Sequence, residues 1–412
     1  MNFEVIKRSH VKRNVLISVV IVLVLSAIIL TFTRAKYRTT KSLPLVNGTI
    51  NYELSDFNLI GAYIQEGDSY TQVDEIPTSG YEFNGEKSYC TVNDENINAT
   101  LNYDMETQSL SVFPLTTKGT KCYLYFDEAS SASDVIEDAY EESQGMLAYD
   151  ETADNNLRYI GANPNNYVYF NCDDYNNPSS STCELWRIIG IFNENSHGIS
   201  GEKLIKIIRS NSLGNIAWDD ANTNNWSTAS LQKTLNGDYL NGKGTYASTG
   251  IKNDTTRNMI ANIIWKLGGH PTHEATSTAF YTSERGTTVY SGRPTTWQGK
   301  VALMYPSDYG YATTGGTVTN REVCLATDLI AWAAYSDCYN NSWLYSNIDN
   351  IWTLTPKSSE NDEVFATFTD ALFYYQSANY TNYAIYPSLY LSLEVSITGG
   401  DGTQSNPYTL SN

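Results

Sequence analysis

Basic residues are scarce in this sequence of 412 residues. Lys and Arg number 26 against 45 Asp and Glu, which gives a formal net charge of −19 at pH 7. A chain this acidic repels nucleic acid phosphates, so we expect no nucleic-acid partner. Only 11 Pro and 27 Gly occur in a chain that is 41% hydrophobic, which excludes collagen-like and wholly disordered proteins.

Histidine is also rare, with four in the chain. The order HPTHE at 270–274 differs from both H-E-x-x-H and H-x-x-E-H, and Pro271 would interrupt a ligand-bearing helix. A G-x-S-x-G elbow and a Gly-rich phosphate loop are both missing. The acidic pairs at 173–174 and 219–220 and the turn at 401–402 lack the spacing of a calcium loop. We therefore predict no catalytic residue, no metal site and no cofactor.

A long apolar run is present near the start of the chain. Residues 15–32 (VLISVVIVLVLSAIILTF) carry no charge, and at about 1.5 Å per residue they nearly span a bilayer core. No Ala-x-Ala site closes the segment, which favours an uncleaved signal anchor over a cleaved secretory signal. We predict a cytoplasmic basic tail at 1–14 and a transmembrane helix at 15–33, which makes the membrane a partner.

The cysteines indicate on which side of the membrane the bulk of the chain lies. All six follow the apolar run, and none has the C-x-x-C or Cys/His spacing of a zinc or redox site. An even set with local spacing is typical of an oxidising compartment, and each closed loop is worth about 3 kcal/mol. We predict extracellular C-terminal domains with three disulfides: Cys90 with Cys122, Cys172 with Cys183, and Cys324 with Cys338.

Two folded regions follow, and together they predict an α+β protein. The first, at 45–127, alternates short β-like runs with turns and predicts a small β-sandwich. An acidic stretch at 128–154 is typical of a linker or a solvated helix. The expected strands of the first region are 49–54, 58–65, 87–92, 99–103, 109–115 and 121–126.

The second region, at 155–412, mixes strands with two predicted helices. The runs at 185–192 and 203–209 are expected to pair as a hairpin. An apolar stripe of Leu231, Leu235 and Tyr239 predicts a helix at 231–240, and a second stripe from Met259 to Leu267 predicts another, capped by Asp254. Further strands are expected at 352–355, 364–368, 372–375 and 384–395.

Several sequence blocks stand out in this second region: 184–190 (ELWRIIG), 207–210, 218–219, 225–227, 235–240 (LNGDYL), 284–294, 303–312, 352–356 and 386–391. These blocks resemble those of a family of Firmicutes membrane-anchored cell-surface proteins. The resemblance implies a C-terminal C-type-lectin-like domain, related to the formylglycine-generating-enzyme group, over about 157–410, and it leaves activity open. Where the family usually has Val-Arg-Pro before the final strand, this chain has Ile385-Tyr386-Pro387, so any role of that arginine is absent.

Tyrosine is abundant, with 32 Tyr against 12 Phe, in a setting of polar residues typical of adaptable binding surfaces. In the resembling fold, ligands are usually held by loops before the final strand. We therefore predict an extracellular binding or adhesion protein with a glycan or protein ligand; the alternatives are a cell-envelope enzyme and a purely structural envelope component. Core positions are expected for Trp186, Trp226 and Trp265. The predicted ligand-binding residues, expected to share one partly exposed patch, are Trp343, Tyr345, Tyr374, Tyr375, Tyr380 and Tyr383.

Overall fold

The computed structural model describes residues 58–67, 69–77, 81–104, 109–113, 120–128, 131–140, 143 and 145–411. The chain divides into two compact units, one ending at Glu128 and one beginning at Ala129. Its secondary structure is mixed α+β with more strand than helix, as the sequence predicts. The predicted anchor at 15–33 lies outside the described residues, and within those residues no helix is long and apolar enough to cross a membrane.

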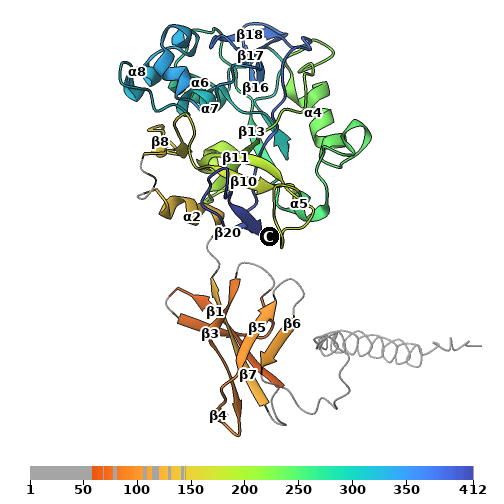
Figure 1. Ribbon diagram of the computed structural model, residues 1–412. Helices are drawn as coiled ribbons and strands as arrows, with labels where there is room; N and C mark the ends of the chain where they lie inside the picture. Colours follow the sequence, from red (N-terminus) through yellow and green to blue (C-terminus); the bar gives the residue numbers. More distant parts are fainter. Residues whose placement is uncertain are drawn as a thin grey trace, which may run out of the picture. The chain divides into compact units, whose positions relative to one another are not determined.

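The first unit consists of two small sheets (orange in Figure 1). Strand β1 is parallel to β7, and the other pairings are antiparallel. The larger sheet has the order β2 (Ser69–Val73), β1 (Asn58–Glu66), β7 (Thr120–Glu128), β3 (Tyr81–Val92), β4 (Glu95–Asn96); the smaller sheet pairs β5 (Thr100–Asp104) with β6 (Ser109–Phe113).

Alternation along β7 explains how these two sheets meet. Cys122, Leu124 and Phe126 are fully buried, whereas the intervening Tyr123 and Tyr125 are half-buried on the other face. The ring of Tyr103 on β5 meets Phe126 edge to face, with 5.5 Å between centroids. The strands predicted at 58–65, 87–92, 99–103, 109–115 and 121–126 are therefore present, and the one at 49–54 lies outside the described residues.

The segment predicted as an acidic linker packs into the second unit instead. Ser131 caps helix α2 (Ala132–Asp138) with a capping box completed by Asp134. Ile136 is fully buried in the core of the second unit, and the backbone N–H of Ala132 donates to the carbonyl of Val395. Strand β8 (Leu147–Tyr149) then joins the central sheet. Of the two alternatives, the linker is wrong and a helix is present, but Ile136 packs into the core; the acidic composition conceals these few buried positions.

The second unit is built on an antiparallel sheet. The hairpin predicted from the sequence is present as β11 and β12, with the short helix α3 (Glu194–His197) in its connection. Gly190 of β11 lies so close to β9 that an added Cβ would stand 2.2 Å from the carbonyl oxygen of Leu157. The order is β15 (Val301–Ala302), β19 (Ser388–Tyr390), β12 (Leu204–Arg209), β11 (Glu184–Phe192), β9 (Leu157–Tyr159), β8, and β10 (Tyr167–Phe170) also pairs with β11.

One predicted helix forms and the other does not. Helix α4 (Ser230–Thr234) continues as the π-helical turn η2 (Leu235–Tyr239), with the predicted apolar stripe buried. The second stripe is divided between the short helix α5 (Asp254–Asn258) and strand β13 (Ile263–Lys266), which pairs with β14 (Thr296–Gly299). Ile263 and Trp265 are buried and Ile264 is exposed, so this apolar run follows a period of two.

Most of the remaining elements lie in the long segment between β12 and β19, and β20 (Ser396–Gly399) and β21 (Thr409–Ser411) follow β19. A three-stranded sheet has the order β16 (Ile351–Pro356), β17 (Glu363–Thr367), β18 (Phe373–Ser377), with β18 at its edge. Helix α7 (Pro306–Tyr311) contacts both α6 (Ser277–Glu284) and β16. The other elements of the second unit are η1 (Trp226–Thr228), η3 (Gly244–Tyr246), α8 (Arg321–Ala326), η4 (Leu329–Ala334) and α9 (Ser336–Asn340).

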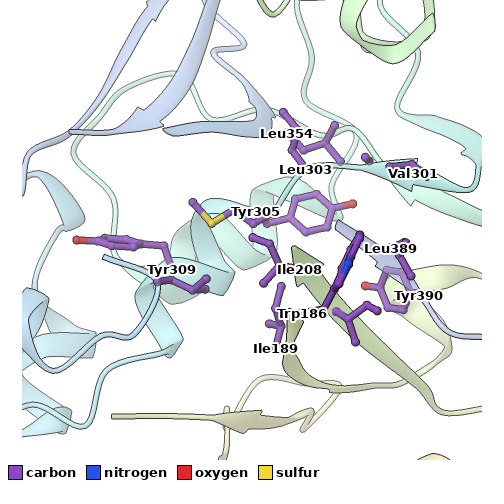
Figure 2. Close-up of a cluster of buried hydrophobic side chains, with 14 of the residues drawn as sticks. Trp186, Ile189, Ile208, Val301, Leu303, Tyr305, Tyr309, Leu354, Leu389 and Tyr390 are labelled. Carbon is purple, nitrogen blue, oxygen red and sulfur yellow. The ribbon is translucent and has the colours of Figure 1, made fainter. Parts of the chain in front are cut away.

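A single hydrophobic core joins these parts of the second unit. Figure 2 shows Trp186 and Ile189 of β11, Tyr305 and Tyr309 around α7, and Leu354 of β16 in one cluster. The tryptophans predicted to be core, Trp186, Trp226 and Trp265, are all buried. The three predicted disulfides, Cys90–Cys122, Cys172–Cys183 and Cys324–Cys338, are also confirmed.

Candidate binding surface

Five side chains gather at the edge strand β18, and we call them the β18 cluster: His273, Lys357, Glu363, Tyr374 and Tyr375. The two tyrosines belong to β18, and Glu363 begins the neighbouring strand β17. Lys357 directly follows β16, where its backbone forms a bridge with His270. The backbone N–H of Ser358 donates to the carbonyl of His270, which holds the loop of His273 beside the sheet.

Aromatic contacts organise this cluster. The rings of Tyr374 and Tyr375 stack with 4.1 Å between their centroids, and the hydroxyl of Tyr374 donates to that of Tyr375 over 2.9 Å. The imidazole of His273 lies 4.6 Å from the Tyr374 ring. Lys357 Nζ stands 3.7 Å from the centre of the Tyr375 ring and 2.6 Å from Glu363 Oε2. Both tyrosines, His273 and Glu363 remain half-buried, so hydroxyl, imidazole and carboxylate groups reach the surface together.

Two members of the cluster, Lys357 and Tyr374, have shifted pKa values. Burial lowers the pKa of Lys357, but the hydrogen bond to Glu363 and the contact with Tyr375 outweigh burial, and the net pKa is raised. The pKa of Tyr374 is also raised, mainly because its hydroxyl donates a hydrogen bond to Tyr375 and secondly because the side chain is partly buried. At neutral pH Tyr374 is therefore a neutral phenol, and Lys357 is an ammonium group paired with Glu363.

Tyr374 and Tyr375 are thus the two predicted residues that the fold brings together most closely. Tyr380 lies just beyond β18 and is 48% exposed. Tyr345 is half-buried, and its hydroxyl donates to the carbonyl of Thr369. The side chains of Tyr345, Tyr374, Tyr375 and Tyr380 are therefore all at least partly exposed to solvent.

The expectation of exposure was wrong for the two other predicted residues. Trp343 is 9% exposed; its indole N–H donates to the carbonyl of Tyr159, and the guanidinium of Arg187 lies over its ring. Tyr383 is 3% exposed and stacks on Trp352 with 4.3 Å between centroids. Both rings complete the core, so neither offers a surface to a ligand.

Sequence reasoning missed His273, Lys357 and Glu363. In the sequence, His273 was considered only as a zinc ligand, and its spacing did not match a zinc motif. The 270–274 loop pairs with the residues after β16, and this pairing depends on tertiary structure that the sequence does not reveal. One local signal was available, because Lys357 and Glu363 flank the turn between two predicted strands, which places them opposite each other.

The acidic turns considered for calcium are satisfied within the protein. Asp219 is buried and accepts hydrogen bonds from the backbone N–H groups of Thr223 and Ser230. The carboxylate of Asp401 accepts from the N–H and the hydroxyl of Thr403. Within the described part of the chain, no group of three or more His, Cys, Asp or Glu side chains is arranged to hold a metal ion.

A second charged cluster lies in the interior, and we call it the buried network: Asp150, Arg158, Lys206 and Asp308. All four side chains are completely buried. Arg158 of β9 donates to Asp150 Oδ2 over 2.8 Å and to Asp308 Oδ1 over 2.9 Å. Lys206 Nζ of β12 lies 2.5 Å from Asp308 Oδ2, and Asp308 on α7 also accepts the backbone N–H of Tyr305.

Burial dominates the electrostatics of Lys206. Its Nζ stands 4.3 Å from the ring centre of Tyr305, 5.3 Å from that of Trp265 and 5.6 Å from that of Tyr390. Desolvation outweighs the attraction of Asp308 and lowers the pKa of Lys206 to about 8. Burial alone would raise the pKa of Asp308, but Lys206 and Arg158 reverse the direction and lower it.

Comparisons of the chain with protein-family models, with curated proteins and with solved structures found no match. The resemblance of its sequence blocks to cell-surface proteins therefore stays a prediction.

Proposed function

We propose that the chain is a membrane-anchored extracellular binding or adhesion protein that presents a C-type-lectin-like domain to a neutral glycan. The first unit serves as a spacer between the anchor and this domain. Support for an extracellular location comes from the three disulfides, which account for all six cysteines. The β18 cluster lies in the long segment before β19, where the resembling fold usually holds its ligands.

The half-buried β18 cluster is the observation that carries the proposal. A sugar presents apolar C–H groups beside hydroxyls, and the cluster sets aromatic edges beside two phenols, an imidazole and a carboxylate. Because the tyrosine rings are already stacked and hydrogen-bonded, little side-chain entropy remains to be lost when a ligand binds.

The charges favour a neutral ligand over an anionic one. Lys357 and Glu363 neutralise each other, and the exposed Glu360, whose Oε1 lies 4.0 Å from Lys357 Nζ, adds negative charge beside them. An acidic polysaccharide would meet this negative charge without a free cation in the cluster.

A neutral-glycan microarray tests the proposal with the full chain in detergent. We expect the wild type to bind at least one neutral glycan and the Tyr374→Ala/Tyr375→Ala double variant to bind it at least about tenfold more weakly, since hot-spot tyrosines contribute roughly 2 kcal/mol or more. Tyr169→Ala is the matched control, because Tyr169 is also half-buried but lies on β10 in the other sheet.

Two outcomes contradict the proposal. Unchanged binding by the double variant would place the glycan site elsewhere. Wild-type protein that binds no neutral glycan would favour a protein ligand or the purely structural role.

A further inference from the structure

The contact between Lys206 and Asp308 differs from every other lysine–carboxylate pair in the described part of the chain. It alone has both side chains fully buried, and its partners lie 102 residues apart, on β12 and α7. We propose that Lys206 and Asp308 become joined by an isopeptide bond, an amide between Lys206 Nζ and Asp308 Cγ that the folded protein forms by itself.

Proximity provides the first argument. Lys206 Nζ is already 2.5 Å from Asp308 Oδ2, within reach of the carboxyl carbon, and both groups are held by regular elements. Holding two reactants in contact replaces a bimolecular encounter by a unimolecular step, which can remove roughly 7–11 kcal/mol of a barrier.

The surroundings provide the second argument. Amide formation requires the neutral amine. Lys206 is completely buried among the rings of Tyr305, Trp265 and Tyr390, and the loss of hydration lowers its pKa and so favours that form. The same burial excludes bulk water, which protects the product from hydrolysis. An ion pair without water carries a large desolvation penalty, and its conversion into a neutral amide removes both charges.

The bond can form without any further reactant. A proton passes from Lys206 Nζ to Asp308 Oδ2 across their hydrogen bond, which leaves an amine beside a carboxylic acid. Nζ then attacks Cγ, and Arg158, 2.9 Å from Oδ1, stabilises the negative charge that develops on that oxygen. A second proton moves from nitrogen to Oδ2, the Cγ–Oδ2 bond breaks, and one water molecule leaves. Arg158 lowers the pKa of Asp308, which opposes the first proton transfer, so we expect slow formation after folding.

The chain contains its own control. Lys357 Nζ and Glu363 Oε2 are separated by 2.6 Å, nearly the same distance, but this pair is partly exposed and the pKa of Lys357 is raised rather than lowered. Proximity alone would link both pairs. The combination of proximity with complete burial links only Lys206 and Asp308.

Peptide mass spectrometry of the full chain, reduced, alkylated and digested with trypsin, decides the matter. We expect a branched peptide that joins residues 204–209 to residues 301–321, uncleaved after Lys206 and lighter than its two parts by one water. Cleavage after Lys357 should be normal. Lys206→Met and Asp308→Ala should each give only the linear peptides.

The wild-type digest is sufficient even if those variants do not fold. If residues 301–321 appear only as the linear, unmodified peptide, the proposal is overturned. It is equally overturned if the branched peptide persists in Asp308→Ala, since the link would then involve another residue.

Discussion

Two lysine–carboxylate pairs in the second unit have almost the same length and opposite electrostatics. Lys206 and Asp308 are separated by 2.5 Å, and Lys357 and Glu363 by 2.6 Å. The pKa of Lys206 is lowered to about 8, whereas that of Lys357 is raised. The distance between the charged groups therefore does not determine the direction of the lysine pKa shift. The degree of burial, and with it the loss of hydration of each lysine, determines it.

The difference follows from where the elements place each pair. The buried network joins β9, β12 and α7 inside the unit, where Arg158 contacts both Asp150 and Asp308, and Lys206 contacts Asp308. The β18 cluster lies at a sheet edge and keeps its polar groups at the surface. The first region should dominate stability and the second should dominate recognition, and variants in both regions test this division.

The largest effect is expected from Arg158→Ala. The substitution leaves the buried carboxylate of Asp150 without the guanidinium of Arg158 that pairs with it, which should lower the free energy of unfolding by about 3–5 kcal/mol. All eight tryptophans lie in the second unit, so tryptophan fluorescence during urea unfolding reports on that unit alone.

Lys203→Ala is the control for that experiment. Lys203 pairs with Glu137, its side chain is 48% exposed, and the change should be within about 0.5 kcal/mol. A loss of similar size in both variants would contradict a special role for the buried network.

The next effect separates two tyrosines that the sequence treats alike. Tyr383→Ala removes a buried ring stacked on Trp352 and should cost about 3 kcal/mol. Tyr380→Ala, at a side chain that is 48% exposed, should change stability by less than about 0.5 kcal/mol. Thermal unfolding monitored by near-ultraviolet circular dichroism checks both. Equal melting temperatures for the two variants would show that Tyr383 is not a core residue.

Much of the fold follows from local patterns. The alternation in β7 is visible in the sequence because one face of that strand is buried. The hairpin of β11 and β12 is visible as two nearly continuous apolar runs, because both faces of these strands are buried over most of their length. The run from Met259 to Leu267 misleads because an apolar stretch satisfies a helical period and a strand period at once. Pairing of β13 with β14, more than thirty residues later, selects the strand.

The candidate site was only partly predictable for the same physical reason. Clustering in sequence identifies Tyr374 and Tyr375, but it cannot distinguish Tyr380 on a turn from Tyr383 beneath it. The buried network was missed because Asp150 lies in an acidic stretch that looks solvated. Its partner Arg158 sits eight residues away on β9, and only the pairing of β8 with β9 makes their contact evident.

A smaller effect concerns pH. Burial would raise the pKa of Asp150, but Arg158 and hydrogen bonds from Asn156 and Thr152 outweigh it and lower the pKa below its ordinary value of 3.8. The ionised Asp150 carboxylate therefore stabilises the folded state fully above about pH 4. This contribution is lost as the pH falls through the lower pKa that Asp150 has in the folded state. Between these pKa values, Asp150→Asn should reduce the pH dependence of the unfolding free energy by up to about 1.4 kcal/mol per pH unit. Urea unfolding at a series of pH values below 5 measures it, and an unchanged slope would contradict the assignment.

The smallest effect is expected from Lys357→Met, which removes the ammonium group of the β18 cluster and keeps an apolar side chain over Tyr375. Because Lys357 and Glu363 retain 11% and 24% of their side-chain exposure, water compensates much of the lost pair, and the cost should be about 1 kcal/mol or less. The difference from wild type should shrink further in about 1 M salt, where the Debye length is near 3 Å. Urea unfolding at low and high salt measures both quantities. If Lys357→Met destabilised the second unit as much as Arg158→Ala, and did so equally at both salt concentrations, the β18 pair would behave as a buried one, and the contrast between the two lysines would be lost.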